Sequence, residues 1–201
     1  MRLRGRKQGK ELAATIKRGQ ELLASQRRQE AVDFLGEAVQ RFPDNPEIRV
    51  LHASILLAVR PSDVAAEATR AIELGADDPL ILVRAGQLLL GRGEVEPARS
   101  CAARAKSLVQ PDFVLMSSLV NLEGLLAAVE GEDALAEEKL RAAWKSDQAF
   151  SSLAVDLVQF LANRDRQAEA LEVIDDALDH ANEKAELERL RSEIVGDAAS
   201  S

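Results

Sequence analysis

Apolar residues along this chain recur at spacings of three and four, which is the pattern of helices that bury one face. Ile48, Leu51 and Ile55 are one example, and no convincing run alternates apolar and polar residues, so strands are not expected. The most regular signal is alanine, which returns at intervals of 33, 34, 38 and 34 residues: Ala38, Ala71, Ala105, Ala143 and Ala177. A period of this length predicts an array of stacked helical repeats, because no single unit can bury its own apolar face.

The period divides residues 11–182 into five predicted helix–turn–helix units. Their approximate ranges are 12–45, 46–78, 79–111, 112–150 and 151–182. The third and fourth units share the longer string Gly-x6-Gly-Glu-x3-Ala, which chance explains poorly. We expect a basic tail over 1–10 before the array, and a capping helix over 183–195 and a polar tail over 196–201 after it.

Capping residues mark several of the predicted helix borders. Asn45 and Asp78 each precede a proline, and we expect both to cap helices that begin at that proline. Ser62 is expected to cap the second helix of the second unit. The interval of 38 residues leaves about one extra helical turn, which should extend the first helix of the fourth unit back to Asp112. The capping helix has its apolar face at Leu187, Leu190 and Ile194.

Small residues that recur at fixed places in the repeats give the chain a resemblance to the tetratricopeptide repeat family. That family's helix–turn–helix unit has small residues at three places where its helices approach closely. The matching residues here are Gly19, Gly86 and Gly124, then Ala31, Ala98, Ala136 and Ala170, then the five periodic alanines. The second unit departs from the pattern, because His52 stands where a small residue is expected. The resemblance implies an all-α solenoid of about five such repeats with a C-terminal capping helix.

The resemblance also implies a partner-binding surface, since the first helix of each unit lines the concave groove in that family. Side-chain amides there could hydrogen-bond an extended peptide, and arginines could pair with its carboxylates. Carried over residue by residue, the polar positions are Lys17, Gln20, Arg49, Arg84, Gln87, Asn121, Asp156 and Gln159. Their expected apolar neighbours are Ile16, Val50, Leu80, Val83, Leu90, Leu122, Leu125 and Val155.

Charge is unevenly distributed along the sequence. Residues 1–30 hold nine Lys or Arg and three Glu, a net charge of +6. The net charge of the whole chain is −8, so the remaining residues together carry −14. The acidic remainder fits a solvated outer face. The basic start leaves open a second function, recruitment to nucleic acid or to an anionic membrane surface. No segment reaches the roughly 18 apolar residues of a membrane span, and a single cysteine makes the cytoplasm the expected location. The chain has 19 Arg and only 7 Lys, and this preference for Arg points to a bacterial source.

Catalytic and metal-binding motifs find little support in the sequence. His52 and His180 have no second ligand at metal spacing, and Cys101 belongs to no nucleophile motif. We expect His52 to pack inside a helix pair, His180 to lie at a helix end and Cys101 to be a small buried apolar residue. The predicted function is therefore a non-catalytic scaffold for a protein or peptide partner, without a cofactor or metal. An assembly factor or chaperone is one form that it could take.

Overall fold

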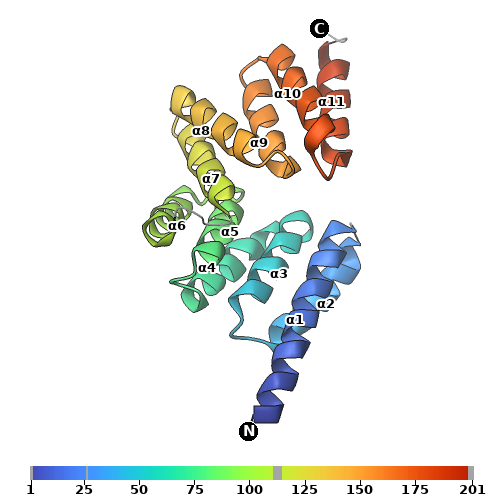
Figure 1. Ribbon diagram of the computed structural model, residues 1–201, viewed down its shortest axis with the longest axis vertical. Helices are drawn as coiled ribbons and strands as arrows, with labels where there is room; N and C mark the ends of the chain where they lie inside the picture. Colours follow the sequence, from blue (N-terminus) through green and yellow to red (C-terminus); the bar gives the residue numbers. More distant parts are fainter. Residues whose placement is uncertain (1, 26, 111–114, 199–201) are drawn as a thin grey trace. The chain divides into compact units, whose positions relative to one another are not determined.

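The computed structural model describes residues 2–25, 27–110 and 115–198, and these residues form eleven α-helices and one short 3-10 helix, with no strand (Figure 1). Side chains are described for 9–25, 27–110 and 115–196. The chain divides into two compact units, Met1–Leu108 and Val109–Ser201. The expected all-α class, built from helix–turn–helix repeats, is confirmed.

Unit 1 contains the first three repeats. Its helices are α1 (Arg2–Ala24), α2 (Arg28–Arg41), α3 (Pro46–Val59), α4 (Val64–Leu74), α5 (Pro79–Leu90) and α6 (Val95–Leu108), with a 3-10 turn, η1 (Pro61–Asp63), before α4. Unit 2 contains two repeats and a closing helix. Its helices are α7 (Met116–Val129), α8 (Asp133–Ser146), α9 (Ser151–Ala162), α10 (Gln167–His180) and α11 (Ala185–Ala198).

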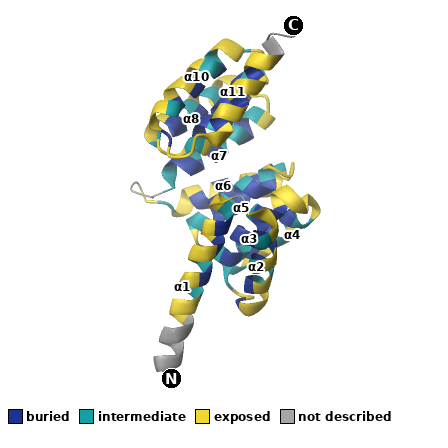
Figure 2. Cartoon of the chain, turned by 90° about the vertical axis from the view of Figure 1, so that its right-hand side faces the viewer, coloured by how far each residue is buried: buried dark blue, intermediate teal, exposed yellow. Residues whose placement is uncertain are grey.

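Each unit is built from two rows of helices. The first helices of successive repeats contact one another, α1 with α3 and α3 with α5 in unit 1, and α7 with α9 in unit 2, where α9 also contacts α11. We call these helices the first row. The second row, α2, α4 and α6 in unit 1 and α8 and α10 in unit 2, joins the repeats, because α2, α4, α8 and α10 each contact the first-row helix that follows. Buried residues lie on the faces where helices meet within each unit (Figure 2).

The periodic alanines are buried where helices meet, as predicted. Ala71, Ala105, Ala143 and Ala177 are 0% exposed, and Ala38 is 4% exposed. Two of the repeat glycines show how tight these contacts are. A methyl group at Gly19 would lie 2.7 Å from Leu35 Cδ2, and one at Gly124 would lie 3.0 Å from Leu140 Cγ. A methyl group at either place would require the facing leucine, Leu35 or Leu140, to shift, which explains the small residues in the pattern.

The turn between the paired helices explains the string shared by the third and fourth repeats. Gly93 and Gly131 both have a φ of 79°, a left-handed conformation that glycine adopts without steric penalty. In each turn the next residue's amide closes back on the preceding helix, as in the 3.0 Å bond from Glu94 N to Leu89 O. The fifth repeat makes the same turn with Asp165 at a φ of 57°.

Helix borders agree with the sequence at two of the three predicted caps. The Asn45 side chain accepts a hydrogen bond from Ile48 N at 2.9 Å, and Asp78 accepts one from Leu80 N at 2.9 Å. The prediction for Ser62 is wrong. Residues Pro61–Asp63 form the 3-10 turn, and the Ser62 hydroxyl bonds the Asp63 side chain instead of a backbone amide of α4.

Three predicted segment ends need correction. Helix α7 begins at Met116 with Leu115 in a turn, so the extra residues of the long interval do not extend the helix through Leu115; residues 112–114 of that prediction lie outside the described part. The basic start is not a separate tail, because α1 begins at Arg2. Helix α11 reaches Ala198, which makes 196–198 helical, while 199–201 are not described.

The closing helix covers the last apolar face of unit 2. Leu187, Leu190 and Ile194 of α11 are all buried and belong to one core with α9 and α10. Over the residues whose placement is given, no helix is both long enough and apolar enough to cross a membrane.

Candidate binding surfaces

The residues predicted to bind a partner fall on the first rows of both units. Lys17, Gln20, Arg49, Arg84 and Gln87 belong to unit 1, and Asn121, Asp156 and Gln159 belong to unit 2. We therefore describe two surfaces, one on each unit.

The first row of unit 1 carries a hollow of about 320 Å³, which we call the unit 1 pocket. Helices α1, α3 and α5 each contribute to its wall. The lining residues are Gln20, Val50, Leu51, Ser54, Leu57, Arg84, Gln87 and Leu88. The structure thus brings together three of the predicted polar residues, Gln20, Arg84 and Gln87, and one predicted apolar neighbour, Val50. Apolar walls with a few polar groups are typical of sites that bind another molecule.

Arg84 is the one charged side chain in the wall of this pocket. It is half-buried, yet among the residues with described side chains it forms no hydrogen bond or ion pair. Gln20 and Gln87 beside it are neutral amides, which can both donate and accept. Lys17, one turn before Gln20 on α1, is exposed and lies outside the pocket wall. The pocket therefore presents a cation whose charge is not balanced by a neighbouring carboxylate.

Arg49 does not join this pocket, because its guanidinium is held inside the second repeat. Its Nη1 donates to Glu67 Oε2 at 2.8 Å and its Nε donates to Pro43 O at 3.0 Å. Buried His52 brings its Nδ1 within 3.5 Å of Glu67 Oε1. The proximity of His52 and Arg49 holds the pKa of Glu67 below its ordinary value. Arg49 thus ties α3 to α4, and His52 is packed within the repeat as expected.

The first row of unit 2 joins two predicted residues in one contact. Asn121 Nδ2 of α7 donates to Asp156 Oδ2 of α9 at 2.6 Å. Asn121 is 1% exposed and its Oδ1 has no hydrogen-bond partner in the described structure, whereas Asp156 is half-buried. Burial raises the pKa of Asp156 above its ordinary value, and the bond from Asn121 offsets part of that rise. Gln159, one turn further along α9, is exposed.

The apolar positions expected beside the groove divide into three groups. Val83 and Leu122 are 0% exposed, so they belong to the core and add no surface to either face. Val50 is 2% exposed but lines the unit 1 pocket. The remaining five are half-buried: Ile16, Leu80, Leu90, Leu125 and Val155.

Sequence reasoning missed four residues of the pocket wall, namely Leu51, Ser54, Leu57 and Leu88. The spacing of Ser54, Leu57 and Leu88 could have identified these three. Ser54 and Leu57 follow Val50 at intervals of four and seven, and Leu88 follows Arg84 at an interval of four, so they share a helix face with residues that were identified.

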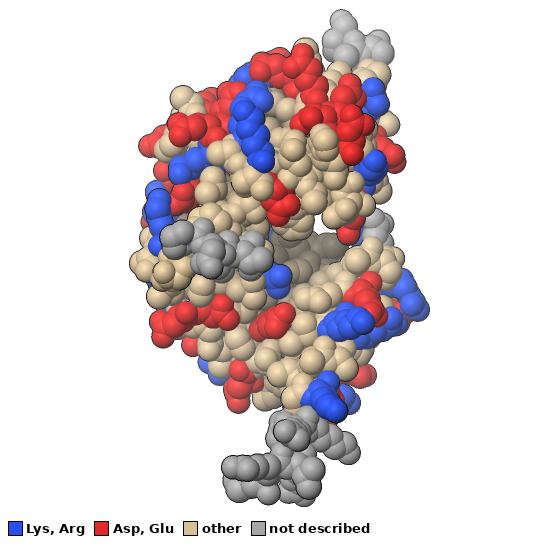
Figure 3. All heavy atoms as spheres, in the orientation of Figure 1, with Lys and Arg blue, Asp and Glu red and all other residues tan. Residues whose placement is uncertain are grey.

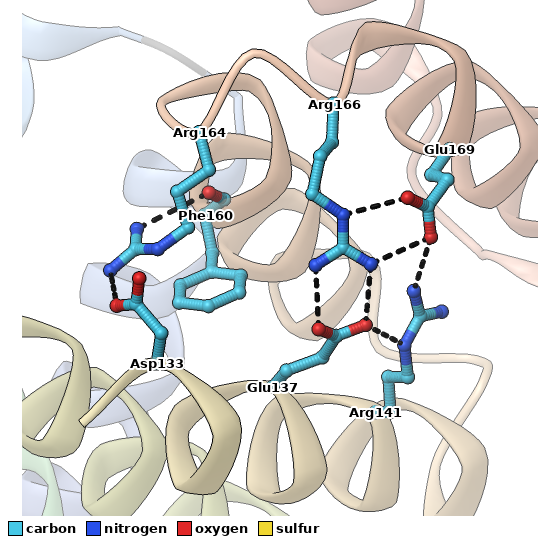
Figure 4. A network of polar contacts seen from close by, with 7 residues as sticks. All are labelled: Asp133, Glu137, Arg141, Phe160, Arg164, Arg166 and Glu169. Carbon is cyan, nitrogen blue, oxygen red and sulfur yellow. Dashed lines mark hydrogen bonds and ion pairs between the residues drawn. The ribbon is translucent and has the colours of Figure 1, made fainter.

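The second row of unit 2 carries a set of charges that satisfy one another (Figure 4). Arg166 donates to both oxygens of Glu137, at 2.6 and 2.9 Å, and to both oxygens of Glu169, each at 2.7 Å. Arg141 donates to the same two carboxylates at 2.7 and 3.3 Å. The contacts from Arg166 and Arg141 hold the pKa of Glu137 at about 2. We call these four residues the Arg166 network.

A second pair beside the network fixes the turn between α9 and α10. Arg164 bonds Asp133 of α8, and its guanidinium carbon lies 3.9 Å from the centre of the Phe160 ring. On the face shown in Figure 3, acidic side chains are dense over the part of unit 2 that holds α10 and α11. Helix α10 alone has five Asp or Glu and no Lys or Arg. The second row of unit 2 is strongly charged, but the carboxylates of the Arg166 network are already bonded to arginines.

No protein-family model matches the sequence, and no curated protein matches it. Solved structures do resemble it. TTC0263 of Thermus thermophilus, a thermophilic TPR protein, superposes with a TM-score of 0.72 at 20% identity, over 92% of this chain and 98% of that one. PilW, a type IV pilus biogenesis factor, gives a TM-score of 0.65 at 16% identity, over 94% and 88%. PilF of Pseudomonas aeruginosa gives a TM-score of 0.62 at 16% identity, over 95% of this chain and 86% of that one.

Proposed function

The chain has the tetratricopeptide repeat fold, and we propose that it is a non-catalytic scaffold that binds an extended segment of a protein partner on its first row of helices. The observation that carries this proposal is the unit 1 pocket, whose wall combines apolar side chains with two amides and the unpaired Arg84. Structures of similar fold that bear names of assembly proteins, such as the pilus biogenesis factor PilW, support an assembly role.

The pocket has the chemistry that a peptide segment requires. The Gln20 and Gln87 amides can bond peptide N–H and C=O groups, and Leu57 and Leu88 offer apolar contact to a side chain. Arg84 can form a bidentate pair with a carboxylate, which gives both charge and direction. Helix α3 lies between α1 and α5 and contacts both, so the wall is held by its neighbours before a partner arrives. A preformed wall loses less entropy on binding than a mobile one.

A randomised peptide library displayed on phage tests this proposal when it is selected on the full chain. Affinities of the recovered peptides are then measured for the wild type and for Arg84→Glu. We expect the charge reversal to weaken binding by about tenfold or more, equal to about 1.4 kcal/mol. The melting temperature should change little, because Arg84 forms no hydrogen bond or ion pair with the described residues.

Arg92→Glu is the matched control for this experiment. Arg92 lies just beyond α5, is exposed and does not line the pocket, so the same reversal of charge should leave affinity unchanged. Equal affinity of wild type and Arg84→Glu for every peptide would show that the unit 1 pocket is not the site. Recovery of no binding peptide would contradict the scaffold proposal itself.

A further inference from the structure

We propose that Asp156 and Asn121 form a second binding site, on the first row of unit 2, that takes a basic side chain of the partner. The ligand class is a lysine ammonium or an arginine guanidinium. This inference rests on the proposed function, since it assigns to the partner a chemical group that unit 2 recognises.

The Asn121–Asp156 pair leaves part of its hydrogen-bonding capacity unused. Asn121 Nδ2 already donates to Asp156 Oδ2, and the other end of the same amide, Oδ1, is buried without a partner. Carboxylate oxygens and an amide oxygen are all acceptors. A buried acceptor without a donor is destabilising relative to one that is satisfied. Asp156 is the accessible member of the pair, and a group that brings donors can bond its carboxylate oxygens.

The Asp156 carboxylate has no cation beside it among the described residues. Asp156 forms no ion pair with any described Lys, Arg or His, although it is half-buried. Burial without a cation disfavours the ionised carboxylate, and the raised pKa of Asp156 reflects that cost. A residue that lowers the stability of the free protein is typical of a site built for another molecule. A cation from the partner would remove the cost.

The pair fits an organic cation better than a metal ion. Calcium and magnesium take about six or more ligands, usually with more than one carboxylate, and no group of three His, Cys, Asp or Glu suited to a metal occurs in the described part of the chain. A single accessible carboxylate, held in place by the Asn121 amide, matches the donors of an ammonium or guanidinium group. Gln159 lies one turn from Asp156 and is exposed, so its amide can bond the backbone beside the basic residue. The net charge of −8 also favours encounter with a basic segment.

A comparison of two peptides tests the inference directly. From the peptides selected on the full chain, one with a lysine is synthesised together with a copy in which norleucine replaces that lysine. Norleucine keeps most of the aliphatic stem and removes the charge. We expect the wild type to bind the lysine peptide about tenfold more tightly than the norleucine peptide. The variant Asp156→Asn should bind the two peptides equally and should bind the norleucine peptide as the wild type does.

Asp179→Asn is the matched control, because Asp179 is an exposed carboxylate of α10 in the second row. This variant should keep the full preference for lysine. The Asp156→Asn protein should melt at or above the wild-type temperature, since it removes a half-buried carboxylate that has no described cation beside it. If it proves unstable, the preference of the wild type for lysine over norleucine still decides the outcome.

Each result separates this inference from the proposed function. If selected peptides bind but contain no favoured basic residue, or if Asp156→Asn keeps the preference for lysine, the second site is wrong and the scaffold proposal stands. If no peptide binds the wild type, both proposals fail. Loss of the preference in Asp156→Asn alone, with the norleucine affinity unchanged, supports the second site.

Discussion

Two charged sites of unit 2, one on each row of helices, differ in how their charges are paired. In the second row, Arg166 and Arg141 donate to Glu137 and Glu169 in a network with two positive and two negative groups. In the first row, Asp156 is half-buried, as Glu169 is, but it receives only the amide of Asn121. Exposure to water is therefore not what decides which charges are paired.

This difference separates structural charges from charges that are available to a partner. The carboxylates of the Arg166 network have their acceptors occupied, and a ligand would have to break bonds within the protein to bind there. Asp156 would gain bonds without breaking any within the protein, because among the described residues only the Asn121 amide donates to it. Unit 1 repeats the contrast. Arg49 is fixed by Glu67, while Arg84 in the pocket wall has no described partner.

The largest expected effect comes from a change that disturbs the framework under both rows. Ala143 of α8 is 0% exposed, and it lies in the core shared by α7, α8 and α9. Ala143→Leu would overpack this contact and lower the free energy of unfolding by about 1–3 kcal/mol. Thermal unfolding followed by circular dichroism measures the loss.

Ala134→Leu provides the control on the same helix, since Ala134 is exposed and the added side chain meets solvent. Its melting temperature should stay close to that of the wild type. An unchanged midpoint for Ala143→Leu would mean that the close contact of α8 with its neighbours tolerates a much larger residue.

The repeat framework could be predicted from the sequence because each of its signals is local and periodic. Close helix contacts require small residues, so Ala71, Ala105 and Ala177 mark the second row, and Gly19 and Gly124 mark the first. The position of the extra residues between the third and fourth repeats could not be deduced from spacing alone. Helix α7 has 14 residues, as α3 does, so the long interval does not lengthen the first helix of the fourth repeat.

The binding surfaces were predicted less well, because side-chain pairing depends on residues that are distant in the sequence. Nothing near Arg49 indicates that Glu67, 18 positions later, holds its guanidinium. Asn121 and Asp156 were both identified, but 35 positions separate them, and their contact appears only when α7 and α9 lie side by side. A family pattern gives the helix face, whereas the fold decides which side chains on that face remain free.

The Arg166 network should contribute to stability in a way that depends on pH. The pKa of Glu137 is lowered from 4.5 to about 2 by Arg166 and Arg141. A carboxyl whose pKa is lower in the folded protein stabilises the fold above its unfolded pKa, and the contribution is lost as pH falls from about 4.5 to about 2. Because Glu137 is partly exposed to solvent, we expect this contribution to be only about 1 kcal/mol after screening. Glu137→Gln should therefore melt lower than the wild type at pH 7, and the difference should shrink toward pH 2.

Glu138→Gln tests whether this effect belongs to the network. Glu138 neighbours Glu137 on α8 but is exposed and makes no ion pair with the described residues. Its substitution should change neither the melting temperature at pH 7 nor the slope with pH. Peptide affinity should be unchanged in both variants, because the network lies in the second row. A loss of affinity in Glu137→Gln would contradict the division between the two rows.

The smallest effect is expected at the turn between α9 and α10, which contains Arg164 and Arg166. Asp165 has a φ of 57°, where the third and fourth repeats have glycine at 79°. A left-handed conformation costs a residue with a Cβ about 1 kcal/mol, less for Asp, and glycine avoids that cost but loses more entropy on folding. Asp165→Gly should therefore raise the free energy of unfolding by no more than about 0.5 kcal/mol. Asp165→Asn keeps a side chain that tolerates this conformation and removes only the charge between the two arginines. A gain in Asp165→Gly that is absent in Asp165→Asn would assign the effect to the backbone. An equal change in both variants would assign it to the charge, and the turn would then be part of the network's electrostatics.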